Sequence, residues 1–368
     1  MNDPIRIIHN IASLHFGGSQ AFVMNLYNNI NRDKIQFDFI VHKEERKDLY
    51  YQVERFGGRI FVCPKYTGKN HFAYCKWWNE FFINHPEYHV IHGHVRSTAA
   101  IYLKIAKKYG LIAIAHSHST SNGSGVCAIV KKMMQFPIRY TADYFFACSN
   151  KAGKWLYGKK ILANPNYRVI LNGIDVDKFS FNQNIRENIR KRLGINENEI
   201  VIGHVGRFTK PKNHKFLIDI YAEYHKINAA SKLLMIGNGE LYAAIQKQCK
   251  ELDILDNVIM LGECFDTENY YQAMDVFIFP SLWEGLGIAL IEAQANGLPC
   301  LVSDNIPQEA ILTNNVKIIK LDFTRKWIEG IADINPGTRY YIKEKLKKYD
   351  ICSIAELMEN FYLDIMRW

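Results

Sequence analysis

The stretch "DVFIFPSLWEGLGIALIEAQANGLPCLVSD" (residues 275–304) decides the fold class. Its first segment, 275–281, is short, apolar and β-branched or aromatic, which predicts a buried strand. A helical pattern rich in Ile, Leu and Ala follows, and 299–304 predicts the next strand. A strand, a helix and a second strand in this order predict two parallel neighbours in one sheet.

The same alternation runs through the rest of the chain. In the first half, strand patterns occupy 5–12, 37–41, 59–63, 89–94, 111–118 and 143–149; in the second half, they occupy 199–208, 232–241, 257–262, 275–281 and 299–304. An Asn-rich segment at 163–184 separates the two series. We therefore expect an α/β protein with two Rossmann-like domains, 1–175 and 176–350, and a last helix at 351–368 that returns towards the first domain. Ligands of open parallel sheets bind at the carboxyl ends of the strands, so the facing edges are expected to form a cleft.

The composition limits the class of protein. No apolar run reaches the about 18–20 residues that span a bilayer, and the first residues lack the basic and apolar regions of a secretory signal. The eight cysteines are scattered without a C-x-x-C pair, which favours a reducing cytoplasm over a disulfide framework or a zinc site. Residues 1–175 carry 23 basic and 11 acidic side chains, whereas 176–368 carry 23 and 26. The basic half could face nucleic acid, an anionic membrane or a phosphorylated substrate.

Three loops after predicted strands suit a phosphate group. Gly17 and Gly18 precede the first helix pattern, where backbone amides can approach an anion, although an ordinary tight turn explains them equally well. Arg207 and Lys212 precede a helix that we expect Asn213 to cap, and two cations there suit a diphosphate, although two solvated surface charges explain them equally well. The third loop, "IGNGE", contains Gly237 and Gly239.

Two glutamates and two histidine pairs are the other candidates. Glu284 lies in the loop after 275–281, and Glu292 lies in an apolar helix, where a lone carboxylate is expensive unless it meets a polar partner. A carboxylate accepts two hydroxyl hydrogens at once, so Glu292 suits a ribose diol and Glu284 a sugar; the alternative is a solvent-facing glutamate. The H-x-H pairs at 92–94 and 116–118 suggest a metal, but no acidic third ligand is nearby, so we expect none.

One acidic pair has the spacing of a metal-binding motif but not the structural position that such a motif requires. Asp175 and Asp177 have the Asp-x-Asp spacing that holds a metal-bound sugar nucleotide in some enzymes. They lie in the linker rather than after a strand of a sheet, which indicates turn chemistry.

Together these motifs resemble glycosyltransferase family 4, which has the GT-B fold of two facing Rossmann-like domains. The matching elements are "GG" at 17–18, the histidine after the fifth strand, "GRFTKPKN", "IGNGE", the E-x7-E element at 284–292 and "SDNIPQE". The stretch "GGSQAFVMNLYNNI…FDFIV" is similar to the subgroup that assembles bacterial capsular polysaccharide or exopolysaccharide. The likeness covers essentially the whole chain and is most specific at 200–310.

The resemblance implies roles for particular residues. The catalytic group would comprise His116 or His118, Arg207, Lys212 and Glu284; the donor would be bound by Gly17, Gly18, Arg207, Lys212, Gly237, Gly239, Glu284, Gly285, Leu286, Gly287 and Glu292. The family has one histidine where this chain has two, and we prefer His116 because it directly follows the apolar run. Arg207 and Lys212 would bind the donor diphosphate, Glu284 the donor sugar and Glu292 the ribose.

The implied reaction is transfer, with retention, of a sugar from a nucleoside-diphosphate sugar, here UDP-linked, to a glycan or lipid-linked acceptor. It would need no metal or other cofactor, because the two cations stabilise the leaving group. We expect the enzyme in the cytoplasm, peripheral on the inner face of a bacterial membrane, with segments 65–82 and 130–140 on the anionic lipid. For Trp77, Trp78, Phe81 and Phe82, the buried face of an ordinary helix explains the pattern equally well. A non-catalytic nucleotide-binding partner subunit, a GT-B epimerase or phosphorylase, and a nucleic-acid binder are the alternatives, although no nucleic-acid motif is evident.

Overall fold

The computed structural model describes residues 3–14, 18–44, 46–119, 126–264, 266–340 and 343–367. The chain forms two compact units, Met1–Gly173 with Lys348–Trp368 and Ile174–Lys347. These limits lie next to the domain boundaries expected from the sequence. The last helix, α16 (Ile351–Ile365), belongs to the N-terminal unit.

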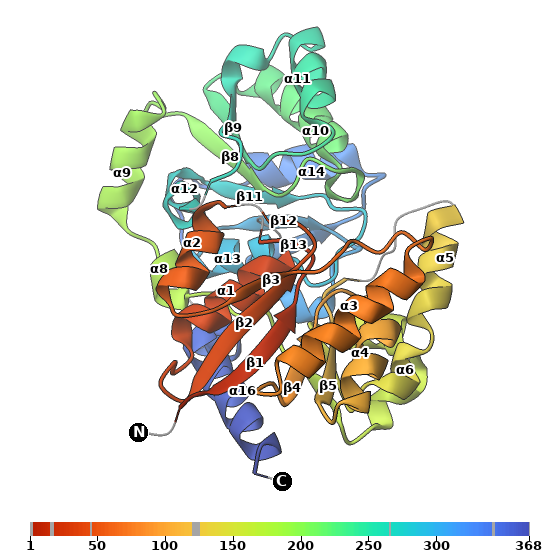
Figure 1. Cartoon of the computed structure of the whole chain (residues 1–368). Helices are drawn as coiled ribbons and strands as arrows, with labels where there is room; N and C mark the ends of the chain where they lie inside the picture. Colours follow the sequence, from red (N-terminus) through yellow and green to blue (C-terminus); the bar gives the residue numbers. More distant parts are fainter. Residues whose placement is uncertain are drawn as a thin grey trace. The chain divides into compact units, whose positions relative to one another are not determined.

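The N-terminal unit contains a seven-stranded parallel sheet in the order β3-β2-β1-β4-β5-β6-β7 (Figure 1). Its strands are β1 (Ile5–Asn10), β2 (Ile35–Val41), β3 (Ile60–Val62), β4 (Val90–Gly93), β5 (Ile112–Ser117), β6 (Tyr144–Ala147) and β7 (Tyr167–Val169). The short β7 lies in the segment that the sequence assigned to the linker. Its Asn- and Pro-containing surroundings mask a three-residue edge strand, which pairs with β6.

Helices cover both faces of this sheet. One face carries α1 (Gly18–Asn29), α2 (Asp48–Arg55) and α16; the other carries α3 (His71–Asn84), α4 (Ala99–Lys108), α6 (Ile138–Thr141) and α7 (Asn150–Tyr157). Figure 1 shows α3, α4 and α6 gathered on one side, with α5 (Val126–Gln135) beside α4. The central strands are buried on both faces because each face meets helices, as is general for parallel sheets, although they also carry buried polar side chains.

The C-terminal unit repeats this architecture with six parallel strands in the order β10-β9-β8-β11-β12-β13. The strands are β8 (Ile200–Val205), β9 (Ser231–Ile236), β10 (Val258–Met260), β11 (Val276–Phe279), β12 (Cys300–Ser303) and β13 (Val316–Ile319). The last of these was not predicted, because alternate exposed lysine and apolar residues in "VKII" give only a weak strand signal at an edge.

Two helix groups enclose this second sheet. One face packs on α10 (His214–Ile227), α11 (Tyr242–Glu251) and α14 (Thr324–Ala332). On the opposite face, Phe277 contacts Tyr271 of α12 (Thr267–Ala273), which packs with α8 (Val176–Phe179) and α9 (Gln183–Arg192). Helix α13 (Ile288–Ala295) packs on α8, and the short α15 (Lys343–Leu346) precedes the return to the first unit.

A buried ionic network ties α9 to the C-terminal sheet. Asp275, which is fully buried before β11, accepts hydrogen bonds from Arg186 at 2.6 Å and Arg190 at 3.2 Å. The backbone amides of Val201 and Gly337 donate to the same carboxylate. Because every oxygen is hydrogen-bonded, this buried charge fixes the helix against the strand ends without an unpaired group.

Both sheets confirm the predicted class, two Rossmann-like parallel sheets, and both reverse strand order at one point. The reversal lies between β1 and β4 in the first unit and between β8 and β11 in the second. Ligands of such sheets bind beyond the carboxyl ends of the two strands at the reversal. The loops after Asn10, Gly93, Val205 and Phe279 are therefore the places to search for sites. None of the helices in the described ranges combines the length and the apolar character needed to cross a membrane.

Candidate active site

In the C-terminal unit, two residues predicted independently meet at the strand reversal. Lys212 Nζ lies 2.7 Å from Glu284 Oε1, and the two side chains are only 18% and 12% exposed. The same ammonium group lies 4.5 Å from the centre of the Phe279 ring. Lys212 comes from the loop after β8 and Glu284 from the loop after β11, so the fold brings them together at the position where a ligand is expected.

Arg207 is the exposed cation of this group. It directly follows Gly206 at the end of β8, and its guanidinium has no hydrogen-bond or ion-pair partner among the described side chains. Asn213 precedes α10 as predicted, but its side chain does not cap the helix: with a left-handed φ of 56° it donates instead to the carbonyl of Pro280. Asn213 thus links the two loops, and Arg207 is left available for an anion.

Two buried histidines lie beneath these cations. His204 Nδ1 bonds the carbonyl of Ile278 at 2.8 Å, and the rings of His204 and His214 are 4.7 Å apart. Burial lowers the pKa of His204 to about 4 and that of His214 to about 2. Both rings are neutral at physiological pH, so the positive charge of the site comes from Arg207 and Lys212.

The predicted glycines at 237 and 239 have a packing role in the structure. A Cβ at Gly237 would lie 2.1 Å from the carbonyl oxygen of Gly206, and one at Gly239 would lie 2.5 Å from that of Phe208. The amide of Gly237 donates to Gly262 and that of Gly239 to the side chain of Asn238. Two loops therefore touch backbone to backbone, which only glycine allows at this distance.

The E-x7-E element bends between its two glutamates. Gly285 follows Glu284, Leu286 is buried, and Gly287 takes a φ of 88° immediately before α13. A Cβ at Gly287 would lie 3.2 Å from the ring of Phe279. This turn starts α13 so that Glu292 lies in its second turn.

Glu292 has one protein partner, which the sequence did not reveal. Tyr271 donates from its hydroxyl to Glu292 Oε2 at 2.8 Å. Burial raises the pKa of Glu292 to about 7; Glu268 raises it further, whereas the Tyr271 hydrogen bond and Lys212 oppose the shift. Glu292 Oε1 has no hydrogen-bond partner in the described part of the chain and is free to accept from a ligand hydroxyl.

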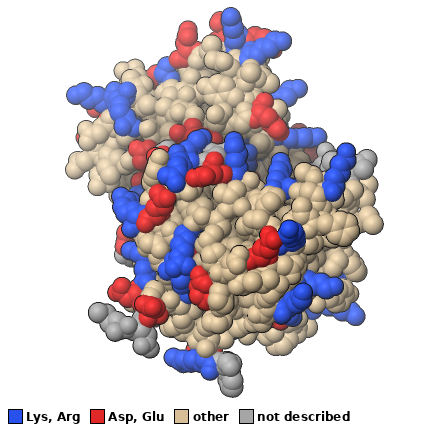
Figure 2. Space-filling model, viewed as in Figure 1, with Lys and Arg blue, Asp and Glu red and all other residues tan. Residues whose placement is uncertain are grey.

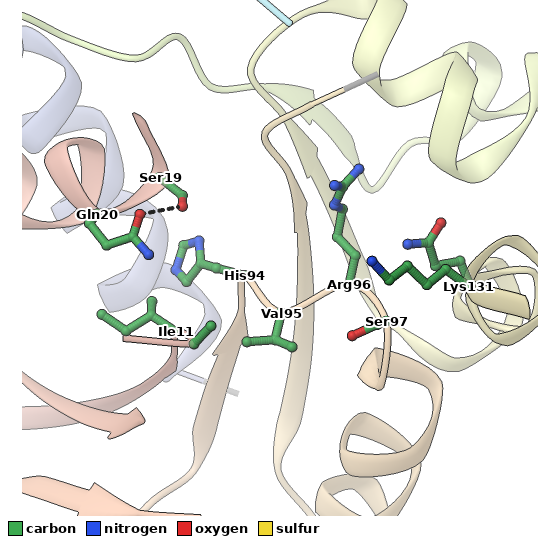
Figure 3. Close-up of a pocket in the computed structure, with 10 residues that line it drawn as sticks. Ile11, Ser19, Gln20, His94, Val95, Arg96, Ser97 and Lys131 are labelled. Atoms are coloured by element: carbon green, nitrogen blue, oxygen red, sulfur yellow. Dashed lines mark hydrogen bonds between the residues drawn. The ribbon is translucent and has the colours of Figure 1, made fainter. Parts of the chain in front are cut away.

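In the N-terminal unit, a cavity of about 280 Å³ opens at the reversal between β1 and β4. Figure 3 shows His94 and Arg96 on the loop after β4, Gln20 on α1, and Lys131 reaching towards Arg96 from α5. The lining comprises Ile11, Ala12, Ser19, Gln20, His94, Val95, Arg96, Ser97, Lys131 and Gln135. Gly18 begins α1 beside it, whereas Gly17 lies outside the described residues. The polar lining with two cations suits an anionic ligand.

The candidate histidines are unequally accessible. His116 lies in β5 and is 1% exposed, whereas His118 lies just past the strand and is part-buried. Phe22 of α1 covers both rings, at 5.2 and 5.5 Å between centres. Burial lowers the pKa of His116 well below its usual value and that of His118 to about 3.

The sequence suggested two separate H-x-H pairs. In the structure, hydrogen bonds join the two pairs into one cluster. His92 Nε2 lies 3.1 Å from His116 Nδ1, and His94 Nδ1 lies 2.8 Å from His118 Nε2. His9 of β1 joins them through a 3.0 Å contact between its Nδ1 and His94 Nε2. The expectation of no third ligand considered only nearby acidic residues, whereas the parallel register supplies further imidazoles from neighbouring strands.

Two other sequence interpretations are settled by the structure. Asp175 accepts from the backbone amide of Lys178 at 3.0 Å and caps α8, which confirms turn chemistry. The aromatic residues of 65–82 are mainly core: Trp78, Phe81 and Phe82 of α3 are buried, and Trp77 stacks on Phe81. The buried-face alternative is therefore confirmed for Trp78, Phe81 and Phe82, which cannot face lipid, whereas Phe72 of the same helix is exposed.

The second segment, in contrast, exposes apolar side chains. Five large ones on α5, α6 and the turn between them are 50–76% exposed: Ile129, Val130, Met133, Phe136 and Tyr140. Lys131 and Lys132 are interspersed among them. Elsewhere on the face drawn in Figure 2, Lys and Arg lie among acidic and uncharged side chains rather than in one continuous stripe.

Comparison with known proteins assigns both units. Residues 16–178 match the family model described as Glycosyltransferase Family 4, and residues 185–334 match Glycosyl transferases group 1. A glycosyltransferase named EpsF from Bacillus subtilis is 29% identical over 97% of this chain and 96% of its own length. The Staphylococcus aureus capsular polysaccharide biosynthesis glycosyltransferase CapH is 23% identical over 98% and 99%.

Solved structures agree on the fold. Sucrose-phosphate synthase from Thermosynechococcus elongatus has a TM-score of 0.79 at 17% identity and covers 98% of this chain and 99% of its own. Anabaena HepE, solved with UDP-glucose, has a TM-score of 0.76 at 17% identity over 98% and 99%. The two Rossmann-like units and the family matches lead to one conclusion: the chain joins a Glycosyltransferase Family 4 domain to a Glycosyl transferases group 1 domain and is a glycosyltransferase of GT-B fold.

Proposed function

We propose that the protein transfers a sugar, with retention at the anomeric carbon, from a UDP-sugar to a lipid-linked acceptor in cell-surface polysaccharide assembly. The observation that carries the proposal is the C-terminal site, where Lys212 and Glu284 meet at the strand reversal and the charge of Lys212 also acts on Glu292. The names of CapH and of an Escherichia coli galactosyltransferase that uses UDP-Gal and a diphosphoundecaprenol acceptor support the substrate classes. The latter is 24% identical over 76% of this chain and 76% of its own length.

The donor's parts match the groups of the site. Arg207 and Lys212 bind the diphosphate, Glu284 accepts from sugar hydroxyls, and Glu292 Oε1 accepts from the ribose while Tyr271 holds Oε2. The Lys212–Glu284 contact keeps the ammonium group extended before the donor arrives. Such preorganised charge acts on the leaving group without reorganisation during the reaction.

Transfer on this proposal needs no metal. The departing diphosphate gains negative charge as its bond to the anomeric carbon breaks, and the two cations stabilise that charge. Retention follows if the acceptor hydroxyl attacks from the face that the diphosphate leaves, giving its proton to a diphosphate oxygen. No side chain then has to act as nucleophile.

His118 is the histidine that we propose to meet the donor sugar. It lies beyond β5 and is the more exposed of the two candidates, whereas His116 is enclosed beneath it. A neutral imidazole donates or accepts one hydrogen bond without adding charge, so its role is to orient a sugar hydroxyl.

The cavity beside α5 is the proposed acceptor site. Arg96 and Lys131 can bind the diphosphate of a lipid-linked sugar, while Gln20, Ser19 and His94 offer hydrogen bonds to the sugar. The exposed apolar side chains of α5 and α6 adjoin this cavity through Lys131 and Gln135. We propose that they lie at the headgroup level of the cytoplasmic membrane face, with Lys132 on anionic lipid.

A nucleotide screen of the purified full chain tests the proposal. UDP should raise the melting temperature more than GDP or ADP, since the proposed donor is a UDP-sugar and a ligand that binds the folded chain stabilises it. UDP-sugars are then offered with a synthetic lipid-diphosphate sugar, and proton NMR of the product gives the anomeric configuration. Inversion would overturn the mechanism, and binding without turnover of any sugar would favour the partner-subunit alternative.

A further inference from the structure

The strand register gathers five histidines on one face of the N-terminal sheet. His9 pairs with His92 across β1 and β4, and His92 pairs with Ile114 across β4 and β5. Because side chains alternate along a strand, His94 lies two residues beyond His92 on the same face, and His116 and His118 follow Ile114 on that face. This face is covered by α1 and α16 and is otherwise apolar.

Within this cluster, we propose that His94, His116 and His118 form a three-nitrogen site for a transition metal ion of the Zn²⁺ class. One nitrogen from each ring lies within 4.8 Å of the others. Imidazole nitrogens bind Zn²⁺, Co²⁺, Ni²⁺ and Cu²⁺, whereas Mg²⁺ and Ca²⁺ prefer oxygen.

Apart from the contact between His94 and His118 themselves, the hydrogen bonds between the histidines leave one nitrogen of each ligand ring for an ion. His116 Nδ1 meets His92, so its buried Nε2, which lacks any partner among the described residues, is the available atom. His94 Nε2 meets His9, which leaves Nδ1, and that atom lies 2.8 Å from His118 Nε2. An ion would take the place of the single proton shared between these last two nitrogens, and that proton would move to the second nitrogen of its own ring.

Without an ion, the contacts between the histidines do not use every N–H group of the cluster. In the chain His9–His94–His118, three neutral rings carry three N–H groups but share only two contacts. The remaining N–H lies at one end of this chain, at His9 Nε2, which has no partner in the described structure, or at His118 Nδ1, which faces the Asn172 side chain. With an ion on His94 Nδ1 and His118 Nε2, the second nitrogens of these two rings carry the N–H groups, and His9 Nδ1 and Asn172 Oδ1 are the acceptors that face them.

The remaining histidines support the ligands rather than coordinate the ion. His9 Nδ1 contacts His94, and His92 Nε2 contacts His116 while its Nδ1 lies 2.6 Å from the Tyr362 hydroxyl. Metal-bound histidines generally make such a hydrogen bond with the second ring nitrogen. The other possible group, His9, His92 and His94, is less suitable because both nitrogens of His92 are already engaged.

The site borders the proposed acceptor cavity. His94 lines that cavity and His118 is part-exposed, so water or a substrate oxygen can complete a tetrahedral shell. Because His118 is the histidine proposed to orient the donor sugar, an ion bound here should inhibit transfer. This corollary rests on the proposed function, whereas ion binding itself does not.

Cobalt provides the test, since tetrahedral Co²⁺ absorbs visible light far more strongly than the octahedral aqua ion. The chelator-treated full chain is titrated with CoCl₂, and tetrahedral bands should grow to one equivalent. His94→Gln, His116→Gln and His118→Gln should each weaken binding at least about 100-fold, and His9→Gln about 10–100-fold. His89→Gln, on the exposed residue before β4 of the same unit, is the matched control and should bind like the wild type.

Other results would overturn the site. A purely octahedral Co²⁺ spectrum would contradict the site. Tetrahedral bands that remain after all three ligand substitutions would also contradict it. A thiolate charge-transfer band would assign the ion to cysteines instead. If the variants fail to fold, as judged by melting, X-ray absorption of the Zn²⁺-loaded wild type decides: three imidazole nitrogens support the site and a sulfur shell refutes it. None of these measurements involves nucleotide, so their failure is distinct from failure of the proposed transfer.

Discussion

Lys212 and Glu284 form an ion pair across the strand reversal of the C-terminal sheet, 72 residues apart in sequence and 2.7 Å apart in space. On the proposed function, the pair holds the cation assigned to the diphosphate next to the carboxylate assigned to the sugar. A donor that bridges the two would contact both charges at once, and substitutions here should separate binding of the nucleotide from binding of the sugar.

Replacing Lys212 by Ala should lower transfer about 100-fold or more, because the charge opposite the leaving diphosphate is removed. Arg207→Ala should lower the transfer rate to a similar extent. Lys210→Ala is the matched control, because this exposed lysine lies only two residues from Lys212 and makes no contact with Glu284. Initial rates with saturating donor measure the effect; a Lys212 variant as active as the control would refute the role.

Glu292→Gln should lower the affinity for UDP and for the UDP-sugar equally, whereas Glu284→Gln should lower mainly the affinity for the UDP-sugar. Glu292 is assigned to the ribose, which both ligands contain, and Glu284 to the sugar, which only the donor carries. Titration calorimetry with each ligand measures the two affinities. Equal losses for both ligands in the Glu284 variant would show that the division is wrong.

UDP affinity should fall as pH drops below about 7. Burial raises the pKa of Glu292 to about 7, and only the ionised carboxylate accepts from both ribose hydroxyls. Affinity should then decrease towards about tenfold per pH unit below that value. Phosphate protonation also contributes, so the same titration of Glu292→Gln is subtracted; identical pH profiles would exclude Glu292 as the titrating group.

The same shift has a consequence for stability. The folded-state pKa lies above the usual 4.5, so between these values the folded protein binds more protons than the unfolded chain. Stability therefore falls as pH rises from about 4.5 to 7. Glu292→Gln should remove this slope, which urea unfolding at several pH values would reveal; an unchanged slope would contradict the shift.

Membrane binding should depend on α5 and α6. The double variant Met133→Ser, Phe136→Ser should reduce cosedimentation with anionic vesicles at least tenfold, because both side chains are exposed. Lys132→Gln should weaken binding at low salt only. Phe72→Ser, at an 88% exposed aromatic on α3, is the control. Equal binding by the double variant and the control would refute this surface.

Asp275→Ala should destabilise the C-terminal unit by about 3–5 kcal/mol, because it leaves Arg186 and Arg190 buried without their carboxylate. Asp333→Ala, at a side chain 73% exposed, should cost about 1 kcal/mol or less. Denaturant unfolding measures both. A loss for Asp275→Ala no larger than that for Asp333→Ala would show that the network adds little.

The sequence predicted the parts of the molecule that local pattern determines. Strands such as β8 and β11 are continuous apolar runs bounded by loops with charge or glycine, so their ends also marked Arg207, Lys212 and Glu284. The edge strands β7 and β13 are short and half exposed, and their patterns resemble loops.

Contacts between segments far apart in the sequence could not be predicted from local sequence patterns. Tyr271 holds Glu292 from 21 residues away, and no motif marks it. The histidine cluster is a property of register: His9 meets His94 only because β1 lies beside β4, and Tyr362 joins from 270 residues beyond His92. A search for histidines at alternate positions of neighbouring predicted strands would have found the first contact but not the second.

The return of α16 to the first unit constrains the order of events during synthesis. Residues 174–347 leave the ribosome before α16 exists, yet Met358, Phe361 and Tyr362 complete the core around α1 and the first sheet. While the second unit is translated, the face of the first sheet that α16 later covers remains exposed in the nascent N-terminal unit. Its final packing can form only when translation reaches α16. A chain released before that point would lack this part of the core. Such a chain would expose apolar surface and be a target for proteolysis.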